Sequence, residues 1–412
     1  MGSEQECWQA LFTGNLRRAA EGFDALRQTE ASTSATAGLF LALVFSGSDE
    51  AAQRILTDRD RDHGDLGMVL WQASWIGASN NIAKALDLLN AFFDRIGATP
   101  SWRAPLSYGR GHIAAIAGDK MGAISNFIEA GQTFALDPML YLKNDDASLR
   151  SVVFQSMHML PEETVGTLAK NQDRNHVAIT WLDRPLPADG NLSTPVIVAA
   201  ADPHYLQLYG SAFTCSVLEH HPDSHIHLHV ADGDACDFDT LVRSLPGSLK
   251  GSVSGSLSDT KRWPVHKPPV YASTRFLIAA DLLNRFQAPL LLLDIDATLK
   301  QPLDPLFSVA ESNDLSCWVR PDGGPGGYTA AGAVAVSPSA GRSVAHLTAA
   351  YIDRRLSEES HHLWFVDQAA LFRAAHHIAT KQEESFRWGD FSSVGSFEDF
   401  FDHAPESPDK RR

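Results

Sequence analysis

The feature that most constrains the fold of this chain is a short apolar run that ends in two carboxylates. Residues Leu290 to Leu293 follow Pro289 without a polar interruption, and Asp294 and Asp296 come next with one residue between them. A continuous apolar run of this length predicts a strand buried on both faces of a largely parallel sheet. Alternate residues of a strand project to one side, so both carboxylates would lie together at its carboxyl end, where open α/β sheets bind ligands.

Two carboxylates in this arrangement can bind a divalent cation. A hard cation held by two side chains normally completes its coordination shell with substrate phosphates. The same spacing recurs at Asp58, Asp60 and Asp62, at Asp232 and Asp234, and at Asp237 and Asp239. Those aspartates lie in polar, turn-like sequence and are expected on the solvated surface. The run at 290–296 therefore predicts an enzyme that acts on a metal-bound phosphorylated substrate.

Charge and composition exclude several classes of protein. The chain has 412 residues and a formal net charge of −16, which argues against a nucleic-acid partner or an anionic membrane surface. No apolar run reaches the ~20 residues that span a bilayer, and the N-terminus has no cationic segment before an apolar one. Four cysteines without CxxC or CxxH spacing indicate neither a disulfide framework nor a zinc site. We therefore expect a cytoplasmic protein that does not span a membrane.

The chain changes character at about residues 145 to 175, which predicts a domain boundary. Before that stretch the sequence is rich in alanine and has helical periodicity, and after it come apolar, strand-like runs separated by Gly, Pro and Asp. We expect an all-α domain at 1–150, a linker at 151–190 and an α/β domain at 191–412.

A repeated phrase marks the helical part. A turn residue pair is followed by a helix with a small residue near its start, and the pairs begin at Gly14, Gly47, Ser79 and Gly118. Intervals of about 32 to 40 residues are those of helix-pair repeats. The region resembles a degenerate tetratricopeptide array, and an ordinary helical bundle is the alternative. In either form we expect it to mediate protein binding or homo-oligomerisation rather than catalysis.

The second part opens with two strands separated by a helix. Residues 195–202 and 225–230 are the strand-like runs, and there is neither a GxGxxG after the first run nor a P-loop anywhere. The order is that of a Rossmann-like nucleotide-binding half whose phosphates are held by other means. His225, His227 and His229 share one face of the second strand. That face permits a metal site, but we expect an exposed sheet face under a loop.

Five phrases in this part carry a family resemblance. They are residues 200–205 (AADPHY), 271–280 (YASTRFLIAA), 291–296 (LLLDID), 330–334 (AAGAV) and 367–368 (DQ). In this order and spacing the chain resembles the metal-dependent retaining glycosyltransferases of the glycogenin and lipopolysaccharide galactosyltransferase type. The resemblance implies the GT-A fold, a Rossmann-like α/β/α sandwich around one mixed sheet. It also implies a nucleotide-sugar donor, most often UDP-linked, and an unidentified glycan, lipid-linked or protein acceptor.

The resemblance implies roles for individual residues. The donor-binding residues would be Ala200, Asp202, Tyr205, Tyr271, Arg275, Asp294, Ile295, Asp296 and Gly332. Asp202 and Tyr205 would contact the nucleobase, Tyr205 by stacking. Arg275, Asp367 and Gln368 would be catalytic, the first beside the sugar phosphate and the other two at the reacting sugar. Asp294, Asp296 and His403 would ligate Mn²⁺ or Mg²⁺.

Two departures from the family pattern keep alternatives open. Ala330 stands where the family has asparagine, and His403 is not followed by the expected glycine. A catalytically inactive GT-A and tetratricopeptide-like scaffold is therefore one alternative. Residues 294–298 also fit DxDxT, the phosphatase motif of the haloacid dehalogenases, in which the first aspartate is a nucleophile. In that family the motif strand opens the domain, whereas here at least two strands are expected before it.

Overall fold

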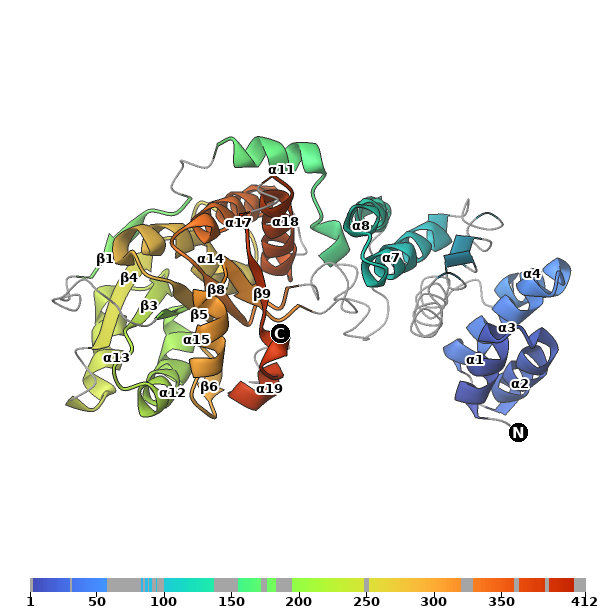
Figure 1. The fold of residues 1–412 in the computed structure, drawn as a ribbon, viewed down its shortest axis with the longest axis horizontal. Coiled ribbons are helices and arrows are strands. Elements are labelled where there is room, and N and C mark those ends of the chain that lie inside the picture. Colours follow the sequence, from blue (N-terminus) through green and yellow to red (C-terminus); the bar gives the residue numbers. More distant parts are fainter. Residues whose placement is uncertain are drawn as a thin grey trace. The chain divides into compact units, whose positions relative to one another are not determined.

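The computed structural model of the chain contains two compact units, Met1–Met159 (unit 1) and Leu160–Arg412 (unit 2) (Figure 1). The structure describes residues 3–29, 32–57, 83, 86–87, 89–90, 94, 100–136, 155–171, 176–182, 195–247, 252–319, 329–358, 363–381 and 385–403.

The described part of unit 1 is helical, as its sequence predicts. Its helices are α1 (Glu4–Phe12), α2 (Leu16–Thr29), α3 (Thr33–Phe45), α4 (Asp49–Thr57), α7 (Pro100–Ile116) and α8 (Lys120–Leu136). Glycines on the helix faces permit close packing, because a Cβ on Gly38 would lie 2.3 Å from Phe23 and one on Gly111 would lie 2.6 Å from Phe127. The alanine-rich sequence therefore forms a tightly packed helical unit.

The turns of the repeated phrase share one backbone geometry. The helices α1, α3 and α7 are each followed by a glycine with positive φ, at Gly14 (83°), Gly47 (78°) and Gly118 (81°). In each turn the amide after the glycine donates to a carbonyl five residues back, at 2.8 to 2.9 Å. Glycine adopts this helix-ending conformation without a Cβ penalty. The phrase at 79–80 lies outside the described residues, and the tetratricopeptide-like assignment stays a prediction.

Unit 2 is built on one mixed eight-stranded sheet. In chain order its strands are β1 (Ile179–Trp181), β2 (Val196–Ala201), β3 (Ile226–Ala231), β4 (Val253–Ser258), β5 (Leu290–Leu293), β7 (Leu315–Cys317), β8 (Ala333–Val336) and β9 (Trp388–Asp390). The spatial order is β1-β4-β3-β2-β5-β8-β7-β9. The central strands β4, β3, β2 and β5 are parallel, and β8 is antiparallel to β5. The chain runs outward from β2 to β4 and then returns to the other side of β2, so the strand order reverses between β2 and β5. Open α/β sheets bind ligands at such a point.

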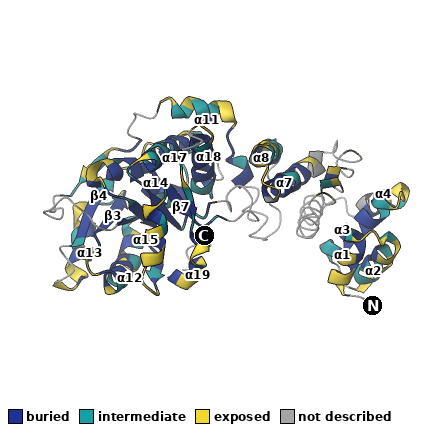
Figure 2. Cartoon of the chain, viewed as in Figure 1, coloured by how far each residue is buried: buried dark blue, intermediate teal, exposed yellow. Residues whose placement is uncertain are grey.

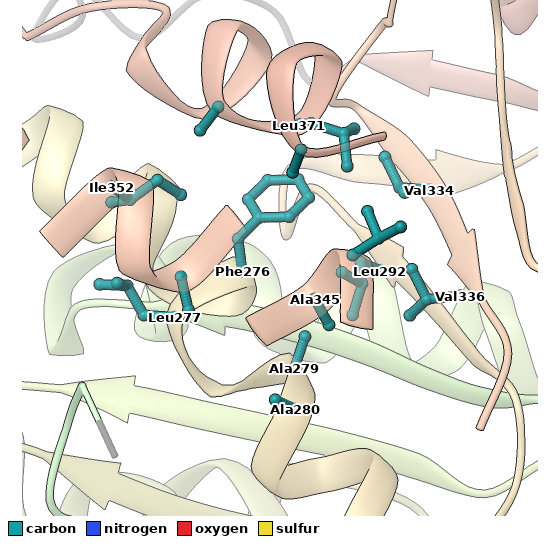
Figure 3. Close-up of a cluster of buried hydrophobic side chains, with 14 of the residues drawn as sticks. Phe276, Leu277, Ala279, Ala280, Leu292, Val334, Val336, Ala345, Ile352 and Leu371 are labelled. Carbon is teal, nitrogen blue, oxygen red and sulfur yellow. The ribbon is translucent and has the colours of Figure 1, made fainter. Parts of the chain in front are cut away.

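Helices cover both faces of the sheet (Figure 1). One face is covered by α14 (Lys267–Phe286), α17 (Ala340–Ser357) and α18 (Val366–Lys381), and the other by α12 (Pro203–His220), α13 (Ala235–Ser244) and α15 (Asp304–Glu311). Alternate residues of each strand enter opposite cores. Leu292 and Val334 lie in one core with Phe276 and Leu371 (Figure 3), whereas Leu291 and Leu293 belong to the second core. The central strands are buried throughout (Figure 2). The predicted α/β/α sandwich, preceded by an all-α region, is confirmed.

A two-stranded sheet lies beside the carboxyl end of β5. Its strands β6 (Ala297–Leu299) and β10 (Phe401–His403) pair antiparallel, with His403 opposite Ala297. The short helix α19 (Phe397–Phe400) precedes β10, and Trp318 packs edge-on against Phe397 at 5.3 Å between ring centroids. An aromatic cluster therefore holds the C-terminal segment against the residues that follow Asp296.

The stretch expected as a linker contains elements of unit 2. Helix α11 (Glu162–Ala169) packs on α17 and α18, and β1 forms an edge strand on β4. The fully buried Arg373 donates to Glu162 Oε2 at 2.8 Å and to the carbonyl of Leu160 at 3.2 Å. Within the described residues, no helix is both long and apolar enough to cross a membrane.

Candidate active site at the carboxyl end of the sheet

Each of the four parallel strands is followed by an aspartate at the same edge of the sheet, and the one after β4, Asp259, pairs with the exposed Lys261. Asp202 follows β2, Asp232 follows β3 and Asp294 follows β5. The strands are in parallel register, so these residues lie at the strand-order reversal between β2 and β5 or beside it. The backbone amide of Asp294 donates to the carbonyl of Gly332 at 3.1 Å, which joins β5 to the start of β8.

One face of α14 supplies the basic and phenolic groups of this edge. The helix begins with Lys267 and two prolines, whose fixed φ suits the first helical turn. Lys267, Tyr271 and Arg275 are four residues apart and therefore line one side of the helix. They meet the strand-end aspartates: Lys267 and Tyr271 contact Asp232, and Arg275 contacts Asp294.

Arg275 is the centre of the site. Its side chain is only 4% exposed, and its Nη1 lies 2.5 Å from Asp294 Oδ1. Its Nη2 donates to the carbonyl of Ala331 at 2.9 Å and lies 3.9 Å from Asp367 Oδ2. The buried guanidinium therefore joins residues from α14, β5, the start of β8 and α18. The forked geometry of arginine is suited to bridging carboxylates and phosphates in this way.

Asp367 and Gln368 lie at the start of α18, on the other side of Arg275. Burial raises the pKa of the Asp367 carboxyl above its ordinary value, and the positive charge of Arg275 opposes that rise without cancelling it. The amide of Gln368 donates to Asp367 Oδ1 at 2.9 Å, and Thr329 donates to the carbonyl of Gln368 at 3.1 Å. A carboxyl in this environment retains its proton to a higher pH than a surface aspartate does.

The segment before Asp367 has features that the sequence did not reveal. Phe365 has a positive φ of 66°, a conformation that bulky residues rarely adopt. Its neighbour Trp364 is 43% exposed, although tryptophan is usually buried. Strained backbone conformations concentrate at functional sites, and no local sequence pattern predicts one here.

Asp202 and Tyr205 have a structural role that the sequence analysis did not assign. Asp202 is the N-cap of α12, where its Oδ1 accepts from the Tyr205 amide at 2.7 Å. The half-buried ring of Tyr205 packs against Tyr209 at 5.4 Å between centroids. Ala200 is buried in β2. The structure therefore places these three at the end of β2, and contact with a nucleobase remains a prediction.

Asp232 was expected on the solvated surface, and the residue is exposed, but its carboxylate makes contacts that a solvated turn residue lacks. Its side chain is only 22% exposed, and it accepts from the amide and the hydroxyl of Thr260 and from the phenol of Tyr271. Burial alone would raise its pKa, but the hydrogen bonds from Thr260 and Tyr271 and the nearby Lys267 outweigh it and lower the pKa. Burial and the charges of Asp232 and Asp202 raise the pKa of Tyr271 to about 12. The strand-end rule that selected Asp294 would have found Asp232 as well.

The other aspartates of that polar stretch behave as expected. Asp234 caps α13, and Asp237 reaches back to its amide in an exposed capping box. The aspartates from 58 to 62 lie outside the described residues.

Gly332 permits close approach beside Asp294. A Cβ at this position would lie 3.3 Å from Asp294 Oδ2 and 3.2 Å from the Phe397 ring. Ile295 is buried in the core beneath the site, so its side chain is a packing residue in this structure. The residue before Asp296 therefore anchors the carboxylates to the sheet.

Binding of a divalent cation by Asp294 and Asp296 stays a prediction, because β5 ends at Leu293, Asp296 lies in the turn that follows, and Asp294 already contacts Arg275. Asp296 is 8% exposed, and β10 brings the backbone of His403 opposite Ala297. The side chain of His403 lies outside the described part of the structure. Among the residues that are described, no three histidine, cysteine or acidic side chains are grouped so as to hold a metal ion. Two carboxylates at a strand end suffice for Mg²⁺ or Mn²⁺ when substrate phosphates supply the remaining ligands.

Comparisons with known proteins add little to this geometry. No protein-family model and no curated protein matches the chain. Among solved structures it is similar to the bifunctional glycosyltransferase WbbM (17% identity, TM-score 0.33), over 47% of this chain and 39% of WbbM. It is similar to the galactosyltransferase LgtC in complex with donor and acceptor sugar analogues (16%, 0.30), over 48% of this chain and 68% of LgtC. It is also similar to mouse xyloside xylosyltransferase 1 (11%, 0.30), over 47% of this chain and 84% of that protein. At such identities and TM-scores, these likenesses carry no weight in assigning a function.

Proposed function

We propose that the chain is a glycosyltransferase that moves a sugar from a nucleotide-sugar donor, with a UDP-linked donor as the expected case. The acceptor would be a glycan, a lipid-linked sugar or a protein. Transfer would retain the anomeric configuration, as in the family that the sequence resembles. Unit 1 would bind a protein partner or a second copy of the chain.

The observation that carries the proposal is the convergence of motif phrases on Arg275. Phrases separated by up to 92 residues along the chain meet at this guanidinium, through Asp294, Ala331 and Asp367. The meeting point lies at the carboxyl end of a mixed sheet, where its strand order reverses. Patterns that matched the sequence by chance would not be expected to assemble around one buried side chain.

The charges of this site suit the departure of a nucleoside diphosphate. Negative charge gathers on the diphosphate as the glycosidic bond breaks, and a fixed guanidinium stabilises that charge at no reorganisation cost. Arg275 has this role, and its contacts with Asp294 and Asp367 orient it. Asp294 and Asp296, with His403 as the proposed third ligand, would hold Mn²⁺ or Mg²⁺. When bound, such an ion supplies a second positive charge for the diphosphate.

Asp367 and Gln368 are the proposed residues at the reacting sugar. The carboxyl of Asp367 is largely shielded from water and lies within reach of the Arg275 charge. It can therefore face a sugar that develops positive charge without being solvated by bulk water. Gln368, at the same helix start, would orient the sugar through its amide.

A binding panel tests the proposal. Thermal unfolding of the full chain is measured with UDP, GDP, CDP and UDP-sugars, each in excess Mn²⁺ and in EDTA. A ligand that binds the native state raises its stability with the ratio of ligand concentration to Kd. We expect UDP and a UDP-sugar to stabilise the protein only with the cation, because the acidic strand end repels a bare diphosphate. UDP affinity that is equal in EDTA and in Mn²⁺ would refute the metal role. No stabilisation by any nucleotide would refute the proposal that the donor is a nucleotide-sugar.

Turnover separates the remaining alternatives. A transferase slowly hydrolyses its UDP-sugar and leaves a generic aryl phosphate intact, whereas a phosphatase of the DxDxT type does the reverse. Nucleotide binding without any hydrolysis or transfer would favour the inactive scaffold, to which Ala330 points. The position of β2, β3 and β4 before β5 also disagrees with the phosphatase pattern, in which the motif strand opens the domain.

A further inference from the structure

Three histidines of β3 and three serines of β4 form one continuous, buried chain of hydrogen bonds, here called the histidine–serine ladder. Its contacts are His225 Nε2 to Ser254 Oγ (2.8 Å), Ser254 Oγ to His227 Nδ1 (2.9 Å), His227 Nε2 to Ser256 Oγ (2.8 Å), Ser256 Oγ to His229 Nδ1 (2.8 Å) and His229 Nε2 to Ser258 Oγ (2.7 Å). None of the six residues is more than 6% exposed. The expectation of an exposed sheet face is therefore wrong. The ring nitrogens in these contacts bind hydroxyls, which argues against a metal site.

The protons of the ladder are coupled. Each hydroxyl has one proton, so Ser254 and Ser256 each donate to one ring and accept from the other. A neutral ring likewise donates through one nitrogen and accepts through the other. One extra proton can be placed on a ring, because both flanking hydroxyls can turn to accept. Two adjacent charged rings would both need to donate to the same serine, whose own proton would then have no acceptor in the ladder.

The surroundings of the ladder disfavour the extra proton. From α14, Phe286 packs on His225 and His227, and from β1, Trp181 packs on His227. The charged group that α14 brings to this region is Arg285, which stacks on Trp181 and opposes a charge on His227. On the same face β2 contributes apolar side chains, and β4 contributes the serine hydroxyls.

The carboxyl end of the ladder is continuous with the candidate site. Ser258 is paired with Ala231, and its carbonyl accepts from the Asp232 amide at 2.8 Å. Two residues later, Thr260 donates to the Asp232 carboxylate through its amide at 2.6 Å and through its hydroxyl. The phenol of Tyr271 donates to the same carboxylate at 3.1 Å. The register that the ladder imposes on β4 therefore determines where Thr260 and Asp232 meet.

We propose that the ladder is an acid-sensitive latch. Proton uptake by its histidines releases β4 and the edge strand β1 from β3, and with them the contacts of Asp232 with Thr260 and Tyr271. The rest of the sheet stays closed, because the paired strands β2, β5 and β8 contain no ionisable side chains. The coupling to nucleotide affinity, though not the opening itself, rests on the proposed function.

Hydrogen exchange of the full chain between pH 7 and pH 5 tests the latch. Protection factors, corrected for the intrinsic pH dependence of exchange, are measured for β1 and β4 and for β2 and β5. An imidazole has a pKa of about 6.5 when exposed and a much lower pKa when buried in the ladder. Each ring that protonates on opening should therefore lower the protection factor about twentyfold between pH 7 and pH 5. We expect that loss in β1 and β4, and we expect protection at pH 5 to be lower there than in β2 and β5, because β4 opens before the sheet as a whole unfolds. Protection in β4 equal to that in β2 at pH 5, or no loss in β4, would overturn the proposal.

Substitution of all three ladder histidines by glutamine is the matched variant. A glutamine amide carries a donor and an acceptor but does not titrate in this range. The protection of β4 in the triple variant should therefore be nearly independent of pH. His220→Gln on α12, outside the ladder, should retain the wild-type pH response. If the triple variant does not fold, the comparison of β4 with β2 in the wild-type chain still decides.

In the wild type, UDP affinity measured in Mn²⁺ should decrease as the pH is lowered, in parallel with the protection of β4. Absence of UDP binding at pH 7 counts against the proposed function, while the exchange data still decide on the latch.

Discussion

The sheet of unit 2 contains two buried polar regions that are built in opposite ways. Around Arg275, one cation lies between Asp294 and Asp367, and its contacts with them differ, at 2.5 and 3.9 Å. Within the described residues, the Nε of Arg275 has no hydrogen-bond partner. Along β3 and β4, by contrast, the histidine–serine ladder is uncharged and its members bond one another in sequence.

This difference distinguishes a candidate ligand site from a hydrogen-bond network that belongs to the fold itself. A buried polar network whose members satisfy one another stabilises one register and needs no ligand. A buried charge with unequal partners is costly to maintain, and such groups are enriched at functional sites. The Arg275 region therefore has the character of a site, and the ladder that of a latch.

The largest expected effect is the acid sensitivity of the ladder. Burial lowers the pKa of His225 to about 4 and that of His229 to about 3, and burial and its charged neighbours lower the pKa of His227 well below its ordinary value. Below about pH 6.5 these three rings bind protons in the unfolded chain but not in the folded chain. Their contribution to the free energy of unfolding is therefore complete above that pH and is lost as the pH falls. Three rings give a slope of up to about 4 kcal/mol per pH unit from about pH 6 to pH 4.

Urea unfolding of unit 2 at pH 7, 6 and 5 measures this slope, with hydrogen exchange to distinguish its transition from that of unit 1. The described residues of unit 1 include two buried histidines, His112 and His158, and burial lowers the pKa of His112 to about 3. His112 should contribute up to about 1.4 kcal/mol per pH unit, so the slope of unit 1 should be smaller than that of unit 2. Equal slopes in the two units would remove the distinction between the ladder and an ordinary buried histidine.

The next effect concerns Arg275→Met, which keeps the length of the side chain and removes the charge. Removing one partner from a buried ion pair costs about 3 to 5 kcal/mol, because the carboxylates that remain are uncompensated. Donor turnover should fall by at least about a hundredfold, since the leaving diphosphate loses its cation. Arg275→Lys restores a charge without the fork and should recover stability more than turnover. Turnover of the Met variant within threefold of wild type would exclude Arg275 from the chemistry.

A smaller effect is expected at Asp296. Asp296→Asn keeps the shape of the side chain and removes one negative charge from a site that must bind a divalent cation, so metal-dependent donor binding should fall by at least about tenfold. Folding should survive, because a like charge near Asp294 is removed. The measurement is UDP-sugar hydrolysis against Mn²⁺ concentration. A wild-type rate with a wild-type Mn²⁺ requirement would remove the main support for the metal assignment.

The sequence predicted the central elements of the sheet because their signals are local. The apolar run 290–293 and the alternation of Ile226, Leu228 and Val230 with histidines become β5 and β3, and the phrases around Arg275 meet in space. The burial of His227 could not be predicted from its own strand. It depends on β4, whose serines are distant in sequence and match the rings only in the register of the folded sheet.

Tertiary pairing also explains what the sequence missed at the site. Asp232 resembles a surface turn residue in the sequence, and its partners Thr260 and Tyr271 come from beyond the next strand. The left-handed backbone of Phe365 is imposed by its surroundings, since nothing in its own residue type favours it. Conversely, the turns at Gly14, Gly47 and Gly118 were predictable, because the conformation there depends on glycine itself.

The smallest effect is expected at Asp237, which shares the Asp-x-Asp spacing and differs in what it contacts. Asp237 is a half-buried member of the α13 capping box, where its Oδ2 accepts from the Asp234 amide at 2.9 Å. Asp237→Asn keeps an oxygen acceptor and removes a charge near the helix N-terminus, so its cost should stay below about 1 kcal/mol. Turnover and the Mn²⁺ requirement should equal those of the wild type, in contrast to Asp296→Asn. A tenfold loss of turnover at Asp237 would mean that general acidity near the sheet, rather than the position of Asp296 after β5, determines the metal response. The distinction between a carboxylate that completes a helix cap and one that follows a buried strand would then have no functional content.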